Sequence, residues 1–369
     1  MNAPASRKRY LDWLRGVAVL VMIEAHIFDS WTRPPDTQTT EFGYAMIVGG
    51  LGAPLFLFLA GVAVPLSAGA KLRRSGDHAA ASRAVARRGL EIFGLAFLFR
   101  VQSWILGWGP ARNLLKIDIL NIMGPSIAAA ALLWRASTSC ARRLTLFAAA
   151  AAATAIATPL VRLSSLVGAL PEPIKGYVAP VPGLSNFVFF PWAGFVFAGA
   201  LVGLVIDRAR TPEQERRANI IFGVSGAAAA LLAYEASFLP SLYRESHFWT
   251  TSPAFFLLRA GMMTAAVSVA FAWLSRSSVA TKWSPLEQLG RTSLFIYWIH
   301  VELIYGLISL DLHDSLTWGQ TWIGYVLFTL FMLLCSIAKE KVETWWKKRS
   351  SDRTTKPIAM PASDSIQPS

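Results

Sequence analysis

The chain has 369 residues, of which 54% are hydrophobic and 15% charged, and its mean hydropathy is +0.44. This apolar content exceeds what a soluble core of that length needs, which excludes a soluble enzyme, a disordered chain and a collagen-like chain. A membrane-spanning helix takes roughly 20 apolar residues, and apolar runs bounded by charge, proline or glycine predict ten of them. The runs cover residues 10–30, 43–69, 85–108, 114–134, 143–161, 187–206, 219–239, 254–274, 289–309 and 320–338. We therefore expect an all-α polytopic integral membrane protein with about ten transmembrane helices.

The 35 Lys and Arg residues outnumber the 22 Asp and Glu residues, which gives a net charge of +13. With the N-terminus inside, 26 of the 35 basic residues fall in cytoplasmic connections and tails. Such an asymmetry is typical of membrane topology, because basic residues concentrate on the cytoplasmic side. We predict that both termini are cytoplasmic, and we expect no nucleic acid as partner. In a bacterium the protein would lie in the inner membrane.

We expect residues 1–345 to form one transmembrane domain and residues 346–369 to form a disordered cytoplasmic tail. The longest outer connection, residues 161–186, contains four prolines and predicts an ordered, non-helical cap or lid. Residues 53–64 and 191–203 show an internal similarity. An inverted repeat of five plus five helices, common in transporters, would instead relate the first span to the sixth.

The first predicted helix carries polar side chains that hydrocarbon excludes. At 100° per residue, Asp12, Arg15, His26 and Asp29 share an arc of roughly 100°, while Glu24 points away. A charge at the bilayer centre costs about 2.5 to 3.5 kcal/mol, so this face is expected to line an internal cavity. Arg15 and His26 lie about 16 Å apart along the axis, which suits the two ends of one elongated ligand.

Each of these side chains has both a chemical and a structural interpretation. Arginine binds phosphate bidentately, and histidine can take a proton from an attacking alcohol or amine, with Asp29 one turn away to orient His26. In the structural interpretation, Arg15 pairs with Asp12 near the interface and His26 makes a hydrogen bond between helices.

A second polar stripe is predicted in the ninth span, where Ser293, Tyr297 and His300 fall within about 60° of each other. We expect His300 to be structural or to position the substrate. Arg100, Asp118 and Asn121 lie in the outer halves of spans three and four and can line the same cavity. Alternatively, Asp118 forms an ion pair with Lys116 at the rim of the cavity. Metal-ligand spacings, glycine-rich phosphate loops and nucleophile elbows are absent from the sequence, so no metal is expected.

Several segments resemble a known family. The stretches RYLDWLRG (residues 9–16) and GAPLFLFLAG (residues 52–61) resemble the opening two helices of the heparan-alpha-glucosaminide N-acetyltransferase catalytic domain family. The later stretches DILNIMG (118–124), PWAG (191–194) and LGRTSLFIYWIH (289–300) match that family in the same order. The spacing of Arg15 and His26 also resembles the arginine and histidine motif of the acyltransferase 3 family, from the same superfamily of transmembrane acyltransferases.

The resemblance implies a membrane acyltransferase. It would move an acetyl or short acyl group from cytoplasmic acetyl-CoA to a sugar hydroxyl or amine on the outer side. His26 would act as catalytic base, Arg15 would lie near the CoA, and Tyr297 and His300 would line the cavity. One branch of the family has asparagine at the position of His26, so N-acylation and O-acylation both stay open.

The expected partners are acyl-CoA, a cell-envelope glycan or other sugar acceptor, and the lipid bilayer; self-association stays open. The alternative function is a transporter or flippase-like carrier of a sugar or lipid-linked sugar, in which the polar stripe lines a permeation path. Transfer of a labelled acetyl group distinguishes the two. Direct transfer and an acetyl-histidine intermediate are both compatible with the sequence.

Overall fold

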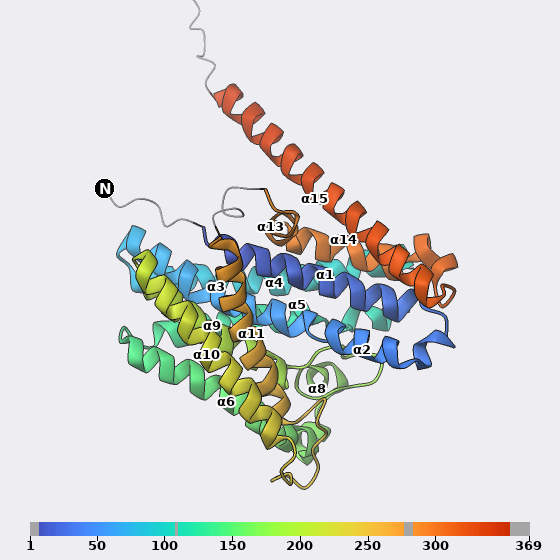
Figure 1. Ribbon diagram of the computed structural model, residues 1–369, viewed down its shortest axis with the longest axis horizontal. Coiled ribbons are helices and arrows are strands. Elements are labelled where there is room, and N and C mark those ends of the chain that lie inside the picture. Colours follow the sequence, from blue (N-terminus) through green and yellow to red (C-terminus); the bar gives the residue numbers. More distant parts are fainter. Residues whose placement is uncertain (1–6, 108–109, 277–282, 355–369) are drawn as a thin grey trace, which may run out of the picture.

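The computed structural model describes residues 7–107, 110–276 and 283–354. Within these ranges the chain is a bundle of α-helices with no named β-strand (Figure 1). Seven helical segments are long and apolar enough to cross a membrane, and α5 and α14 are shorter apolar helices. The prediction of an all-α polytopic membrane protein is confirmed.

Eight of the ten expected spans each correspond to one helix. These are α1 (Arg9–Trp31), α4 (His78–Gly107), α5 (Ile119–Arg135), α6 (Cys140–Leu163), α9 (Phe189–Arg208), α10 (Pro212–Ala236), α11 (Pro253–Leu274) and α15 (Trp318–Thr354). The other two spans are split, into α2 (Thr40–Gly49) with α3 (Gly52–Ser75) and into α13 (Pro285–Arg291) with α14 (Ser293–Tyr305). At the second break the backbone of Thr292 is non-helical, and its hydroxyl lies 2.6 Å from the Ser336 hydroxyl of α15.

Glycines let helices approach closely in this bundle. A Cβ on Gly199 of α9 would lie 1.9 Å from the backbone oxygen of Phe58 in α3, and one on Gly61 would lie 2.0 Å from that of Val196. Small residues at such crossings are typical of membrane helices, whose association depends on close packing. The two segments with internal similarity, residues 53–64 and 191–203, therefore belong to helices that pack against each other.

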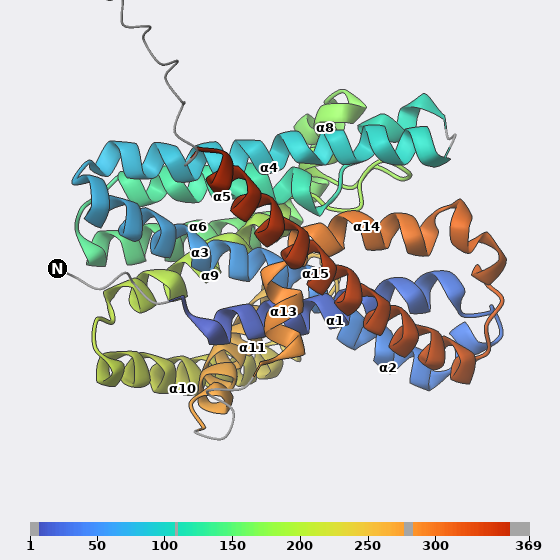
Figure 2. The same ribbon diagram turned by 90° about the horizontal axis from the view of Figure 1, so that it is seen from above.

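Helix α1 occupies a central position and contacts α2, α3, α11, α13, α14 and α15. Two tightly packed pairs lie on different sides of it, α4 with α5 and α10 with α11 (Figure 2). Because α1 is surrounded, its polar side chains face protein or an internal cavity and are kept from lipid.

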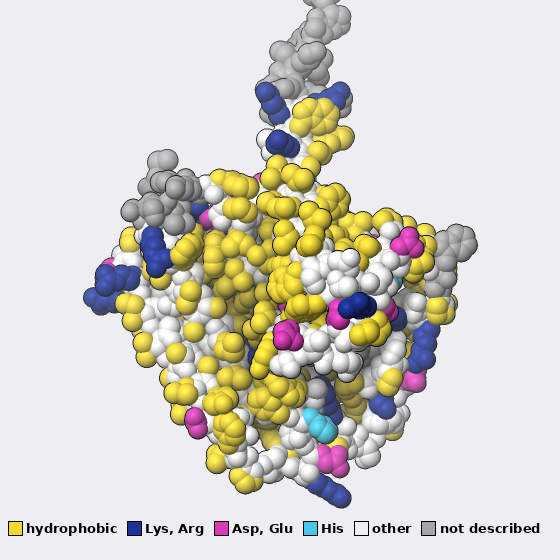
Figure 3. Space-filling model, turned by 45° about the vertical axis from the view of Figure 1, so that its right-hand side comes forward, with side chains coloured by type: hydrophobic (Ala, Val, Ile, Leu, Met, Phe, Trp, Pro, Cys, Tyr) yellow, Lys and Arg dark blue, Asp and Glu magenta, His cyan; other side chains and the backbone are white. Residues whose placement is uncertain are grey.

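The outer surface of the bundle is apolar. Large hydrophobic side chains of α4, α6, α10, α11 and α15 are exposed, including Leu90, Leu160, Leu232, Val269 and Leu327. Figure 3 shows hydrophobic side chains over much of one face. This surface suits contact with lipid tails.

The outer connection between α6 and α9 differs from its prediction. It contains two short helices, α7 (Ser165–Gly168) and α8 (Glu172–Val178), so the expectation of a non-helical segment was wrong. Proline is tolerated there because Pro171 caps α8 and Pro173 lies in its first turn, where the missing N–H would be unpaired anyway. The segment then returns to the start of α5, where the amide of Ile117 donates to Leu184 (2.7 Å).

The C-terminal helix α15 runs to Thr354, beyond the boundary expected at residue 345. Its last turns project from the bundle in Figure 1. The rest of the predicted disordered tail, residues 355–369, lies outside the described residues. Three short 3-10 helices complete the connections: η1 (Asp36–Gln38), η2 (Ala111–Leu115) and η3 (Leu307–Leu312).

Candidate active site

A cavity of about 1520 Å³ runs along the inner faces of α1, α3, α4 and α14. Its lining extends from Ala53 to Lys71 on α3 and from Ala84 to Ser103 on α4. At 1.5 Å per residue these stretches measure about 27 to 29 Å, close to the hydrocarbon thickness of about 30 Å. The cavity is therefore long enough to connect the two sides of a membrane.

One end of the cavity is strongly cationic. Five basic side chains line it, namely Arg15, Lys71, Arg87, Arg88 and Arg291. Glu91 also lines this end and pairs with Arg87 (3.3 Å) and Arg88 (3.2 Å). Arg291 also pairs with Glu340 (3.1 Å) and Arg15 with Asp12 (2.6 Å), so the five cations face three carboxylates. This end keeps a net positive charge, which favours an anionic ligand.

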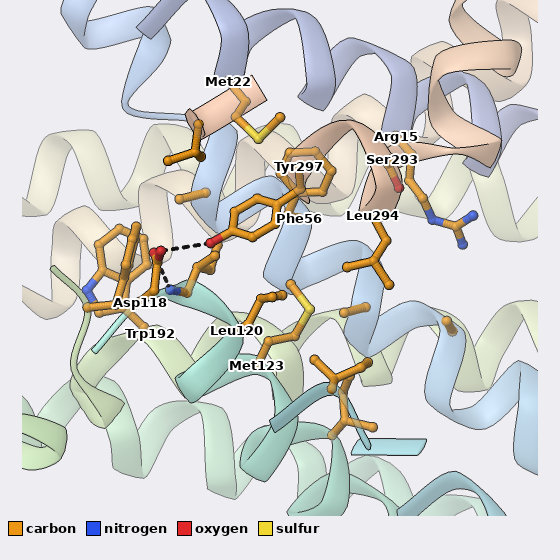
Figure 4. Close-up of a pocket in the computed structure, with 18 of the residues that line it drawn as sticks. Arg15, Met22, Phe56, Asp118, Leu120, Met123, Trp192, Ser293, Leu294 and Tyr297 are labelled. Atoms are coloured by element: carbon orange, nitrogen blue, oxygen red, sulfur yellow. Dashed lines mark hydrogen bonds between the residues drawn. The ribbon is translucent and has the colours of Figure 1, made fainter. Parts of the chain in front are cut away.

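Arg15 both pairs with Asp12 and lines the cavity. Its guanidinium lies 2.6 Å from the carboxylate of Asp12, which also contacts Arg7. Asp12 is buried behind the cavity wall, whereas Arg15 lines the cavity near Ser293 (Figure 4). Asp12 therefore holds Arg15 in place and leaves part of its guanidinium available to a ligand.

His26 lies against His300 of α14. Its Nδ1 is 2.9 Å from Nε2 of His300, and the two rings are stacked with 12° between their planes. His300 is completely buried, and His26 lines the cavity. The structural interpretation, a hydrogen bond between helices, is thus present together with exposure of His26 to the cavity.

The hydrogen bonds of His300 determine which nitrogen of His26 carries its proton. Nδ1 of His300 lies 2.9 Å from the carbonyl oxygens of both Ile296 and Tyr297, and a carbonyl can only accept. Neutral His300 therefore has its proton on Nδ1 and accepts at Nε2. His26 must donate from Nδ1, which leaves the lone pair of its Nε2 free to accept a proton.

Asp29 has a different partner from the one expected. Its carboxylate accepts a hydrogen bond from the hydroxyl of Tyr305 (2.8 Å), whose ring packs edge-on against His26 at 5.6 Å between centroids. Within the described residues, the side chain of His26 is hydrogen-bonded to His300, and that of Asp29 to Tyr305.

Asp118 joins the outer residues into one network. It pairs with Arg100 (2.8 Å) and accepts from the hydroxyl of Tyr297 (2.8 Å; Figure 4). The alternative ion pair with Lys116 was wrong, because the guanidinium of Arg100 reaches Asp118 from the neighbouring helix α4. The three linked side chains line the same cavity as His26.

Asn121 stabilises the start of α5. Together with Asp118 it forms a capping box, and its side-chain amide donates to the hydroxyl of Tyr177 in α8 (3.1 Å). Burial at this contact raises the pKa of Tyr177. Asn121 is itself buried, so it supports the cavity wall from behind.

The structure thus brings the predicted residues together in two groups. Seven of them line the cavity: Arg15, His26, Asp29, Arg100, Asp118, Ser293 and Tyr297. Three lie behind its wall: Asp12, Asn121 and His300. The sequence analysis missed Lys71, Arg291 and Tyr305 as lining residues. Tyr305 had a signal, since it lies eight residues after Tyr297 and hence on the same face of α14.

Comparison with known proteins identifies the family. A family model described as heparan-alpha-glucosaminide N-acetyltransferase, catalytic, matches residues 7–235. No curated protein matches the chain significantly. The matched region includes Arg15, His26 and Asp118, whereas α14 with His300 follows it. Since more than half of the chain is matched, the chain belongs to the heparan-alpha-glucosaminide N-acetyltransferase catalytic family and is a membrane acyltransferase.

Proposed function

We propose that this protein transfers an acetyl group from cytoplasmic acetyl-CoA to an amine or hydroxyl of a sugar that enters from the other side of the membrane. The observation that carries the proposal is the elongated cavity, which connects a cationic end with His26. Membership of an N-acetyltransferase family supports acetyl transfer as the reaction.

The cationic end suits the phosphates of CoA, because guanidinium groups bind phosphate oxygens bidentately. Lys71 lies near the end of α3, and Arg87 and Arg88 lie in the first part of α4. The distribution of basic residues favours the cytoplasm for these two helix ends. Much of the cavity wall is apolar, and Figure 4 shows Met22, Phe56, Leu120, Met123 and Leu294 in it together with Arg15. An extended pantetheine arm fits such a passage.

In the proposed reaction the acceptor nitrogen or oxygen attacks the thioester carbonyl while Nε2 of His26 takes the acceptor's proton. The new C–N or C–O bond forms, the C–S bond breaks, and the CoA thiolate leaves with the proton that His26 then returns. General base catalysis of this kind contributes about 10² to 10⁴ in rate. His300 is a positioning residue, since its Nε2 keeps accepting from Nδ1 of His26 when His26 becomes positively charged.

Purified protein in detergent tests the proposal with radiolabelled acetyl-CoA as donor and glucosamine as the probe acceptor. We expect wild-type protein to form labelled N-acetylglucosamine and His26→Ala to lose at least 10²-fold in kcat. The His26→Ala variant should still bind CoA in calorimetry, because the cationic end is intact. His247→Ala, at an exposed outer position, is the matched control and should behave as wild type.

Wild-type turnover by His26→Ala would contradict the assignment of the base. If protein incubated with acetyl-CoA but without acceptor gave an acetylated peptide containing His26, the reaction would proceed through an acetyl-histidine intermediate and not by direct transfer. The carrier alternative would be correct if the protein neither hydrolysed nor transferred the acetyl group, yet moved unmodified sugar across proteoliposomes.

A further inference from the structure

A second, smaller cavity adjoins the outer part of the first. It measures about 220 Å³ and lies between the end of α6 and the beginnings of α9 and α11. At roughly 30 Å³ per water molecule, this volume equals about seven waters and admits one charged group with part of a sugar ring. The two cavities share Asn186 and Trp192 in their walls, so one ligand can extend into both.

Two arginines, Arg162 and Arg259, line this second cavity. The Nε of each is buried and has no hydrogen-bond partner within the described residues. Among those residues, neither arginine forms an ion pair with an acidic side chain within 4 Å. Both side chains are half-buried, but a guanidinium N–H withdrawn from water normally has an acceptor, so two such Nε groups in one cavity favour a bound anion.

The position of Arg259 links it to the main cavity. Its Nη2 lies 3.3 Å from the point where a Cβ of Gly50 would stand, and Gly50 lines the main cavity. Its guanidinium also lies over the ring of Phe255, 4.0 Å from the centroid, which holds it toward the second cavity. An anion bound there therefore lies beside the outer part of the passage that contains His26.

Aromatic side chains make up much of the remaining wall. Trp192, Trp249, Phe255 and Phe256 line the second cavity together with the two arginines. Indole and phenyl rings offer apolar faces against which the C–H side of a sugar ring packs, and the indole N–H can donate to a sugar oxygen. The wall thus combines cations for an anion with surfaces for a sugar.

We propose that the second cavity is an acceptor subsite that binds an anionic substituent of the sugar, a carboxylate, sulfate or phosphate ester, through Arg162 and Arg259. The inference rests on the proposed function in that the sugar is the acceptor of the acetyl group. The bound anion would anchor the acceptor at the outer side while its amine or hydroxyl reaches toward His26. The protein would therefore select negatively charged sugars over neutral ones.

Binding of two probes to the full chain in dodecyl maltoside, without acetyl-CoA, tests the subsite. Glucosamine 6-sulfate should bind about ten- to a hundredfold more tightly than glucosamine, the range expected for a charge-assisted hydrogen bond. Arg162→Gln and Arg259→Gln should each bring the two affinities to within about threefold. Arg162→Lys and Arg259→Lys keep the charge and should retain part of the preference. Arg244→Gln, in the exposed outer loop, is the matched control and should keep all of it.

Equal affinity of the wild-type protein for the two probes would overturn the subsite, and so would a preference that survives both glutamine variants. Loss of the preference on addition of phosphatidylglycerol would assign the arginines to lipid headgroups and would also overturn it. The proposed function is tested separately. If the protein transfers no acetyl group but still binds glucosamine 6-sulfate more tightly than glucosamine in an arginine-dependent way, the proposed reaction is wrong and the anion subsite is supported. Transfer without any charge preference contradicts the subsite alone.

Discussion

Replacing His300 tests how His26 is held in its reactive form. His300→Ala removes the Nε2 acceptor that lies 2.9 Å from Nδ1 of His26. A hydrogen bond to a charged group contributes about 1.5 to 3 kcal/mol, and this one gains its full value only when His26 has taken the proton. Since about 1.36 kcal/mol corresponds to a factor of ten in rate, kcat should fall about 10- to 150-fold.

The KM for acetyl-CoA should stay near its wild-type value in His300→Ala, because the five cationic side chains of the donor end are unchanged. His300→Gln should recover much of kcat, since its side-chain carbonyl can accept from Nδ1 of His26. The assay is the initial rate of labelled N-acetylglucosamine formation against acetyl-CoA concentration. Thermal unfolding in the same detergent controls for the packing lost with a completely buried ring.

A wild-type kcat in His300→Ala would refute the reasoning, because His26 would then be active without its acceptor. The reasoning also fails if His300→Gln is as slow as His300→Ala although the two unfold at the same temperature. A merely structural role would lower the stability of both variants without this split between kcat and KM.

Three further substitutions test other parts of the account. Arg15→Ala should raise the Kd for CoA, measured by calorimetry, about tenfold, because one charge-assisted contact is lost. An unchanged Kd would mean that the donor binds elsewhere. Gly199→Ala would put a Cβ 1.9 Å from a backbone oxygen of α3 and should destabilise the protein by about 1 to 3 kcal/mol in denaturant unfolding, whereas Gly94→Ala, with no atom within 4 Å of its Cβ, should not. Asp118→Asn leaves the buried Arg100 without its counter-charge and should cost about 3 to 5 kcal/mol, and a wild-type unfolding midpoint would contradict that pairing.

Most helices could be predicted from the sequence because each is a long apolar run bounded by charged residues or by proline and glycine. The breaks at Gly50 and Thr292 were not predicted. The first interrupts an apolar run for only two residues, and the second leaves a single residue, Thr292, between two helices. At the second break the hydroxyls of Thr292 and Ser336 are hydrogen-bonded, a contact between distant residues that a local pattern does not contain. Helix α8 of the outer connection was not predicted because its two prolines, which usually break helices, stand at positions where they begin one.

Some features of the candidate site could also be predicted from the sequence, and others could not. Helical periodicity determines which side chains share a face. Three residues of the polar stripe of α1, Arg15, His26 and Asp29, line the cavity, and the fourth, Asp12, lies behind its wall. The partner of His26 could not be predicted, because His300 is 274 residues away and packing decides which polar residues meet. The sequence does not show whether an arginine within a helix finds a hydrogen-bond partner, and the fact that the Nε of Arg259 has none within the described residues is visible only in three dimensions.

Transfer across a sealed membrane tests the central claim most directly. Proteoliposomes are loaded with glucosamine, and labelled acetyl-CoA is supplied outside to the molecules whose cationic cavity end faces outward. We predict that N-acetylglucosamine accumulates inside with the wild-type protein, that His26→Ala gives none, and that glucosamine does not leak. Product that forms only when donor and acceptor share one side of the membrane would contradict a cavity that receives them from opposite sides.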